Sequence, residues 1–355
     1  MLQTPRNRQL VEYIAGTVTR KFPGDIIDAA KRALADFLGV AVGAHNDAPV
    51  QPVRATLKRW NAAGNARVFL GGQTTPALGV AATTAGGLVG SFGTHGKPVH
   101  AGKAAMDGIL AAQLAADGFV AATHLYELGE LDKTPRKKAA HQATLLDVFI
   151  QDHDVEPLPL DFDQSWEILT NGFKPFASCR ATQASTQAAR TLAAKIAGRT
   201  IKRVHAKVHP NALITAGKLA PRTPLEGKFS VPFCIALALR GHAVVASDFT
   251  DDKMHDASIM GVLPVVELEA VQGQPPHSAH LDVYLVDGEH LHADTDIIIG
   301  HPDNPMSWDD LRVKFEGLVE PVIGAAKTKT LFDTARHFEQ PGSIARISAL
   351  LAGAR

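Results

Sequence analysis

Alanine-rich segments with a helical repeat dominate the first 170 residues, and they constrain the fold more than any other feature. Apolar residues recur every three to four positions in residues 25–44, and again in residues 102–119. The many alanine side chains would let such helices approach one another closely. A helical domain is therefore predicted for residues 1–170. The stripe expected to face its core is Ile27, Ala30, Leu34, Phe37, Leu38 and Ala41 in the first segment, and Ala105, Ile109, Ala112 and Leu114 or Ala115 in the second.

The pattern changes near residue 170, where short alternating segments replace the alanine-rich ones. Residues 201–208 alternate apolar and polar side chains as a half-buried strand does, and residues 279–296 predict two strands around an Asp-Gly turn. Ser307 is followed three residues later by Asp310, which predicts the start of a helix. The predicted fold class is therefore mainly α with a second α/β domain.

Composition argues against several classes of function. Lys and Arg together number 36, as do Asp and Glu, so the formal net charge is zero. Nucleic acid attracts a cationic excess, so it is not an expected partner. No apolar run approaches the roughly 18 residues that span a membrane, and no signal peptide is expected. The only two cysteines, Cys179 and Cys234, do not make a disulfide framework, so a cytoplasmic location is expected.

Residues 91–108 combine glycines with basic side chains at the start of the second alanine-rich segment. Lys97 and His100 lie on this predicted turn, whose glycines would bring backbone N–H groups close to an anion at a helix N-terminus. Pro98 stands where a P-loop requires Ser or Thr, and no acid or thiol beside the histidines completes a zinc site. The stretch predicts either a carboxylate-binding corner or a tight turn with solvated cations.

Four segments, in this order along the chain, resemble those of the MmgE/PrpD family, which includes 2-methylcitrate dehydratase, cis-aconitate decarboxylase and an iminodisuccinate epimerase branch. Residues 93–119 resemble the family's Lys-Pro-hydrophobic-His-x-Gly-x-Ala-Ala segment, and residues 171–189 its Phe-Lys-x-[Tyr/Phe/His]-x-x-Cys segment. Residues 208–242 are similar to the segment that ends in Glu-x-Lys-Phe-Ser, and residues 300–315 to the late Gly-His-Pro-x-Asn-Pro segment.

The resemblance implies a large helical domain, residues 1–170 rejoined by about 331–355, and a smaller α+β lid domain, residues 171–330. It implies a homodimer that acts on a small di- or tricarboxylate without a metal or organic cofactor. Such substrates react through a carbanion or enolate beside a carboxylate, where lysines stabilise charge and a histidine moves the proton. The residues carried over are Lys97 and His100 as catalytic groups, and Lys97, Lys174, His209 and Lys228 as substrate-binding groups.

One departure concerns the segment in which the family carries its catalytic aspartate and one catalytic histidine. Only residues 73–76 join the flanks that should surround it, which looks like an internal deletion. Apolar residues 68–70 and 78–88 would then lose their cover, so we expect an exposed apolar patch or an extensive dimer contact there. The family often has a histidine at the position of Gln183. The acidic residues Asp248, Asp251 and Asp252 are interpreted as solvated surface.

The resemblance favours a lyase of the dehydratase type whose catalysis is reduced by the missing segment, because groups that act as a unit lose most of their effect together. An epimerase or isomerase of a dicarboxylate is the enzymatic alternative, favoured by residues 208–217. A catalytically inactive member that binds a carboxylate or a partner subunit is the third interpretation, and the deletion favours it.

Overall fold

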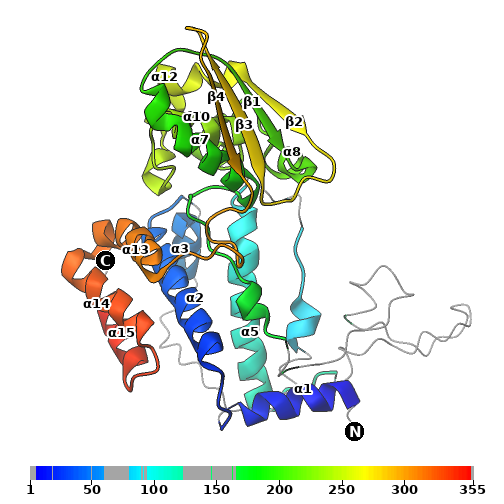
Figure 1. The fold of residues 1–355 in the computed structure, drawn as a ribbon. Coiled ribbons are helices and arrows are strands. Elements are labelled where there is room, and N and C mark those ends of the chain that lie inside the picture. Colours follow the sequence, from blue (N-terminus) through cyan, green and yellow to red (C-terminus); the bar gives the residue numbers. More distant parts are fainter. Residues whose placement is uncertain are drawn as a thin grey trace, which may run out of the picture. The chain divides into compact units, whose positions relative to one another are not determined.

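The computed structural model describes residues 5–17, 19–48, 50–59, 80–88, 91, 94–122, 145, 162 and 165–352. The fold is mainly helical with one small mixed sheet, which confirms the predicted fold class (Figure 1). The chain separates into two units: the first contains residues 1–23, 51–91 and 95–166, and the second contains residues 24–50, 92–94 and 167–355. The predicted domain bounds stay a prediction.

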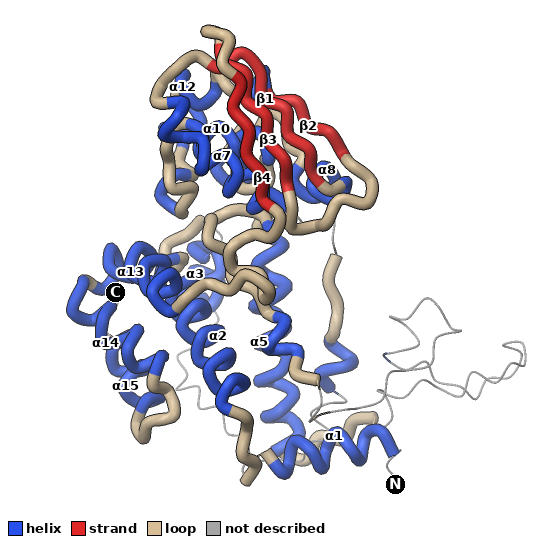
Figure 2. Tube along the Cα trace, in the orientation of Figure 1, coloured by secondary structure: helices blue, strands red, loops and turns tan. Residues whose placement is uncertain are grey.

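The second unit contains a four-stranded sheet in the order β2-β1-β3-β4, drawn as red tubes in Figure 2. β1 and β2 are parallel, and the other neighbours are antiparallel. Gly288 turns the β3–β4 hairpin with a φ of 97°, which favours glycine. The predicted strand and hairpin are both confirmed. The strands are β1 (Ile201–Val208), β2 (Val266–Ala270), β3 (Ala279–Leu285) and β4 (His290–Thr295).

One face of this sheet is apolar and faces two helices, α7 (Gln183–Ile196) and α10 (Val231–Leu239). α7 packs against β3, β4 and α10. Alternate residues of β1 and β3 are buried, as the period of two requires. All nine residues of α10 are buried, because its sequence carries no charged side chain. Short helices complete this part: η2 (Glu167–Thr170), η3 (Arg180–Thr182), α8 (Pro210–Ala216), α9 (Pro224–Gly227), η4 (Ala246–Asp248), α11 (Asp251–His255), α12 (Ala257–Met260) and η5 (Leu263–Val265).

A second apolar core in the same unit joins one early helix to three late ones. Its helices are α2 (Gly24–Gly43), α13 (Trp308–Ile323), α14 (Ala325–Arg336) and α15 (Ser343–Leu351). α13 starts with the predicted Ser307–Asp310 capping box. Glycine allows close packing of α2 on α13, since a Cβ added at Gly39 would lie 2.9 Å from Cδ2 of Phe315.

The buried face of α2 differs from the predicted stripe. It consists of Ile26, Ala35, Leu38, Gly39 and Val42, so Leu38 of the predicted set is buried, and Leu34 packs half-buried against the same core. Phe37 of the predicted stripe is 66% exposed. Gly39 and Gly43 on this side of α2 leave room for Phe315 and Leu318 of α13, which the apolar repeat alone does not reveal.

The first unit contains α1 (Pro5–Gly16), α5 (Gly96–Ala116) and nearly all of α3 (Val50–Arg59). α5 begins six residues before the predicted helix and includes the glycine-rich stretch. Its buried residues are Asp107, Ala111 and Ala115. Of the predicted stripe, Ala115 is buried and Ala112 is half-buried, whereas Ala105 and Ile109 are exposed, so the prediction was right in part.

The expectation of an uncovered apolar patch falls largely on residues 68–79, which lie outside the described residues. In the described part of the flank, Val80 and Ala82 are buried, whereas Leu88 is 76% exposed. The patch therefore stays a prediction. None of the helices that the structure describes is long and apolar enough to cross a membrane.

Candidate functional site

The predicted catalytic pair, Lys97 and His100, lies on the first turns of α5 rather than on a turn before it. Both residues are half-buried. Their spacing of three puts them on one side of the helix. His100 contacts the 80–88 segment closely, since a Cβ added at Gly87 would lie 3.0 Å from the Nδ1 of His100. A glycine at position 87 therefore leaves room for the imidazole.

A buried carboxylate that sequence reasoning missed follows on the same helix. Asp107 is 9% exposed, and its Oδ2 accepts a hydrogen bond of 2.7 Å from the Nζ of Lys103. Lys103 also donates to the backbone oxygen of Thr84 in the 80–88 segment. His100, Lys103 and Asp107 are separated by three and four residues, so they form one stripe along α5. The i, i+4 Lys–Asp spacing was the signal that could have found it.

Lys174 and Lys228 lie in the second unit, in the segments that precede α7 and α10. Lys174 is half-buried. The Nζ of Lys228 is 5.6 Å from the ring centroid of Phe249, a cation–π distance, and the backbone oxygen of Lys228 accepts a hydrogen bond of 2.8 Å from the N–H of Cys179. Lys97 and Lys174 belong to different units, so a cleft that they share stays a prediction.

Gln183, where the family often has a histidine, is fully buried and holds the loop before it in shape. Its Oε1 accepts a hydrogen bond of 3.2 Å from the N–H of Phe176, and its Nε2 donates to the backbone oxygen of the same residue at 3.2 Å. Nε2 also lies 3.1 Å from the Oγ of Ser178. The amide therefore satisfies buried polar groups that would otherwise lack partners.

His209 lies at the junction of β1 with α8, where it is the N-cap residue of α8 and directly precedes Pro210. Its Nδ1 accepts a hydrogen bond of 3.1 Å from the N–H of Asn211. A neutral imidazole has one donor and one acceptor nitrogen, so the neutral form of His209 carries its proton on Nε2.

Three further basic residues, which the sequence prediction did not include, accompany His209. His277 lies in the loop between β2 and β3, and its ring centroid is 4.5 Å from that of His301, which lies after β4. Arg180 begins η3, which packs against α8. We call Arg180, His209, His277 and His301 the Arg–His cluster. The segment from 300 to 315 was matched as a motif, but its histidine was not connected to residues elsewhere, because only the fold brings these loops together.

The electrostatics of the Arg–His cluster disfavour further positive charge. Burial lowers the pKa of His277 first of all, and the nearby His301, Arg180 and His209 lower it further. Nη1 of Arg180 and Nδ1 of His277 are both buried without a hydrogen-bond partner among the described residues. Such unpaired buried donors and acceptors are rare in folded proteins, and each requires an explanation.

A second group of histidines lies on the polar face of the sheet, where each contacts an aspartate. Asp282 accepts from Nε2 of His290 at 2.7 Å and from Nδ1 of His292 at 2.9 Å. Asp294 lies 2.9 Å from Nε2 of His292 and 2.7 Å from Nδ1 of His280. These five residues are called the His–Asp ladder. The hydrogen bonds to Asp282 and Asp294 raise the pKa of His292.

The remaining candidates have structural roles. Burial raises the pKa of the Cys234 thiol to about 12, which excludes a thiolate there at neutral pH. The interpretation of Asp248 as solvated surface was wrong, because its side chain is only 13% exposed and accepts a hydrogen bond of 3.0 Å from the N–H of Val245. Asp251 and Asp252 are exposed in the first turn of α11, as the sequence suggested. Within the described residues, no group of three or more His, Cys, Asp or Glu side chains could hold a metal ion.

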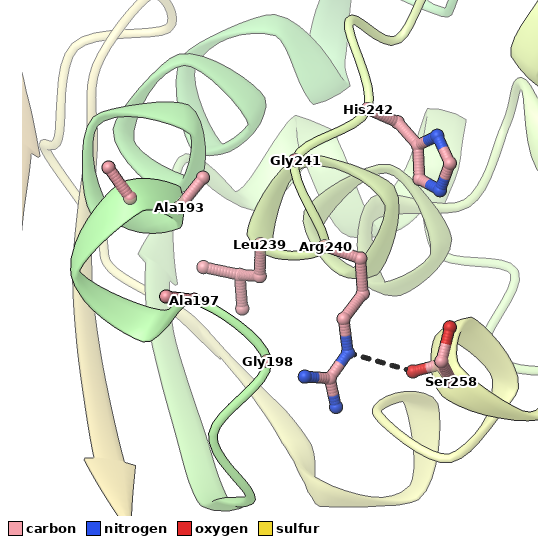
Figure 3. A pocket seen from close by; sticks show the side chains of 9 residues that line it. Ala193, Ala197, Gly198, Leu239, Arg240, Gly241, His242 and Ser258 are labelled. Atoms are coloured by element: carbon pink, nitrogen blue, oxygen red, sulfur yellow. Dashed lines mark hydrogen bonds between the residues drawn. The ribbon is translucent and has the colours of Figure 1, made fainter.

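A depression of about 720 Å³ lies at the C-terminal ends of α7 and α10 (Figure 3). Arg240 crosses it and donates from Nε to the backbone oxygen of Ser258 at 2.9 Å and from Nη1 to that of Arg199 at 3.2 Å. Carbonyl groups at helix C-termini attract cations, and the guanidinium already occupies that position. None of the predicted site residues lines this depression.

The comparison with known proteins identifies the second part of the chain. Residues 176–340 match the MmgE/PrpD C-terminal domain. The chain is 22% identical over 316 residues to the cis-aconitate decarboxylase of Mus musculus, and 24% identical over 307 residues to that of Homo sapiens. Each alignment covers 82% of this chain and 60% of the relative, so the chain spans about 60% of the length of these curated relatives. Residues 176–340 thus belong to the MmgE/PrpD C-terminal domain family, and the chain has distant similarity to cis-aconitate decarboxylase.

Proposed function

We propose that the chain is a lyase-type MmgE/PrpD protein that acts on a small di- or tricarboxylate, with dehydration as the reaction. The match of residues 176–340 to the family's C-terminal domain carries this proposal. The basic residues of both units support it, because polycarboxylates need several cationic or N–H donor groups for recognition. A homodimer and a cytoplasmic location complete the proposal.

The chemistry assigns His100 and Lys97 to the reacting end of the substrate. Histidine is the residue type best suited to move a proton near neutral pH, and a lysine ammonium stabilises the enolate that forms beside the carboxylate. Their place on adjacent turns of α5 lets both face one ligand. Lys174, His209 and Lys228 would hold the other carboxylates. The buried Asp107 is a candidate for part of the acid–base role that the missing segment has in the family.

A binding protein without efficient turnover is the second candidate, and the short connection at residues 73–76 favours it. Abstraction of a proton beside a carboxylate needs a positioned base, and such help contributes about 10² to 10⁴ in rate. If the family's aspartate and histidine have no substitute, carboxylate binding persists while turnover is lost.

An assay of the purified chain separates these candidates. Methylcitrate, citrate, cis-aconitate and iminodisuccinate are supplied separately, and the ultraviolet absorbance of an unsaturated product and the change in optical rotation are followed. A lyase gives turnover that His100→Ala abolishes and that His255→Ala, an exposed histidine on α11, leaves unchanged. Absence of turnover on all four substrates, with binding retained, contradicts the lyase and supports the binding protein.

A further inference from the structure

Two buried nitrogen atoms of the Arg–His cluster lack hydrogen-bond partners among the described residues. Nη1 of Arg180 and Nδ1 of His277 are buried with no hydrogen bond to the described residues. A guanidinium carries five N–H donors and no acceptor, so its unpaired nitrogen can be satisfied only by an acceptor. The two atoms lie in neighbouring segments: the Arg180 guanidinium lies against Gly172, and Gly172 lies against the backbone oxygen of Gly300. The next residue, His301, has its ring centroid 4.5 Å from that of His277. Their partner is therefore expected to be one shared molecule.

The tautomers of two cluster histidines add further donors. The N–H of Asp303 donates to Nδ1 of His301 at 3.2 Å, as the N–H of Asn211 does to Nδ1 of His209. Two backbone groups thus occupy the Nδ1 positions, and the neutral forms of His301 and His209 both carry a proton on Nε2. The cluster consequently offers N–H donors from a guanidinium and two imidazoles.

The charged groups that lower the pKa of His277 are all basic: they are His301, Arg180 and His209. The carboxylate beside the cluster is that of Asp303, 3.4 Å from Nδ1 of His301, but its side chain is 73% exposed. A solvated carboxylate at the rim screens the cluster weakly. An anion inside the cluster would balance the positive charge of Arg180 and would give the buried nitrogen atoms a hydrogen-bond partner.

The backbone around Arg180 is shaped to hold the guanidinium in place. A Cβ added at Gly172 would lie 2.7 Å from Nη2 and 3.3 Å from Nη1 of Arg180. The same glycine lies against Gly300, whose φ of 85° and backbone hydrogen bond from Phe173, 2.8 Å, set the position of the neighbouring His301. Two glycines therefore fix the distance between the loops that supply Arg180 and His301.

We propose that the Arg–His cluster is an anion pocket that binds one carboxylate group of the substrate, with Arg180 as its anchor and His277 and His301 as flanking donors. The identity of the ligand rests on the proposed function, whereas the pocket itself rests on the geometry. A planar carboxylate matches the fork of a guanidinium and can accept two parallel hydrogen bonds from it. Arg180, His277 and His301 would thus recognise substrate, and none of them was predicted from sequence.

Calorimetric titration of the full chain with citrate tests the pocket without any need for turnover. Loss of a charge-assisted contact of this kind corresponds to a factor of roughly ten to a hundred in affinity, so Arg180→Gln should raise the Kd of citrate at least about tenfold. The matched control is Arg203→Gln, because Arg203 is exposed on the polar face of the sheet and pairs with Glu267. Its Kd should stay within about twofold of the wild-type value.

Two further variants keep the test decisive if Arg180→Gln does not fold, as judged by circular dichroism. Arg180→Lys keeps the charge and loses the fork, and should give an intermediate Kd. His301→Gln should weaken citrate severalfold. Wild-type affinity in any folded variant at Arg180 overturns the pocket, while the lyase proposal stands or falls by turnover alone. A second titration uses inorganic phosphate: binding as tight as that of citrate overturns the carboxylate preference, and much weaker binding supports it.

Discussion

The His–Asp ladder and the Arg–His cluster contain the same ring chemistry in opposite electrostatic surroundings. In the ladder, both ring nitrogens of His292 contact carboxylates, at 2.9 Å each, and this arrangement favours the cationic imidazole, in which both nitrogens are donors. In the cluster, burial and the neighbouring basic groups favour the neutral form of His277. The pKa of His292 is raised and that of His277 is lowered, although both belong to one unit of the chain.

One domain thus contains histidines that its own carboxylates neutralise and histidines that lie among other basic groups. The ladder supplies its own counter-ions on exposed strands, and it therefore needs no ligand. In the cluster, Nη1 of Arg180 and Nδ1 of His277 are buried without a hydrogen-bond partner among the described residues, which is why we propose an external anion there. Sequence counts of histidine could not make this distinction, because the two groups differ only in which side chains the fold places beside them.

The largest effect is expected from removing the side-chain amide of Gln183, which holds the loop that leads to Arg180. Gln183→Ala deletes the amide that pairs the N–H and oxygen of Phe176 within the loop leading to Arg180. Leaving buried polar groups unpaired costs about 1–3 kcal/mol for each group. We expect the free energy of unfolding to fall by about 3 kcal/mol, with loss of citrate binding at temperatures where the wild type binds.

Chemical denaturation monitored by circular dichroism measures this loss, and Gln113→Ala on the exposed side of α5 is the control. A change below about 0.5 kcal/mol in Gln183→Ala, the usual range for surface substitutions, would show that the loop does not depend on the amide. Restoring the family's residue with Gln183→His should destabilise as well, because an imidazole cannot repeat the donor and acceptor pair on Phe176.

The next largest effect is expected when the Arg–His cluster is given a carboxylate partner like those of the His–Asp ladder. His277→Asp places a carboxylate inside the Arg–His cluster and supplies the counter-ion that every ladder histidine already has. The new aspartate should pair with Arg180 and weaken citrate binding by about a hundredfold or more, through loss of a donor and like-charge repulsion. Calorimetry measures the affinity, and His277→Asn is the uncharged control, with an expected loss of about tenfold. Equal losses in the two variants would contradict the charge argument.

A smaller effect is the splitting of the two histidine titrations. NMR titration of ring protons should give His277 a pKa below 6.5 and His292 a pKa above 6.5. Between the folded pKa of His277 and 6.5 the unfolded state binds more protons, so this residue makes stability fall as pH falls through that window. Saturating citrate should raise the pKa of His277 and leave that of His292 unchanged. The same shift in both residues would indicate a general ionic-strength effect.

The fold class, the hairpin and the start of α13 could be predicted because each depends on local signals: alternation, an Asp-Gly turn and a capping box. The core faces of α2 and α5 could be predicted only in part. Their buried sides are set by which helix approaches and how closely, as Gly39 against Phe315 illustrates, and that depends on distant residues. The start of α5 was placed too late because its glycines resemble a turn.

The candidate site could be predicted only for residues that lie within a single sequence motif. Segments that resemble those of the family predict five of its residues: Lys97, His100, Lys174, His209 and Lys228. Arg180, His277 and His301 come from separate loops that meet at the end of the sheet, and no spacing in the sequence connects them. Gln183 shows the converse, since a position expected to matter for chemistry holds a loop together instead.

The smallest effect is expected from opening the ladder itself. Asp282→Asn removes the carboxylate that bonds His290 and His292, and with it the first cause of the raised pKa of His292. The pKa of His292 should therefore fall towards 6.5.

A histidine whose folded pKa is raised contributes stability that is fully present below 6.5 and is lost as pH rises through the folded value. The variant should thus be less stable than the wild type below 6.5 and equal to it at high pH. The side chains of His290 and His292 are about half exposed, so solvent screening limits the difference to about 0.2–1 kcal/mol. Denaturation of both proteins across this pH range measures it, and citrate affinity, which depends on the other region, should not change. A loss of citrate binding in Asp282→Asn would show that the two groups of histidines are coupled and would contradict their separation into surface and pocket.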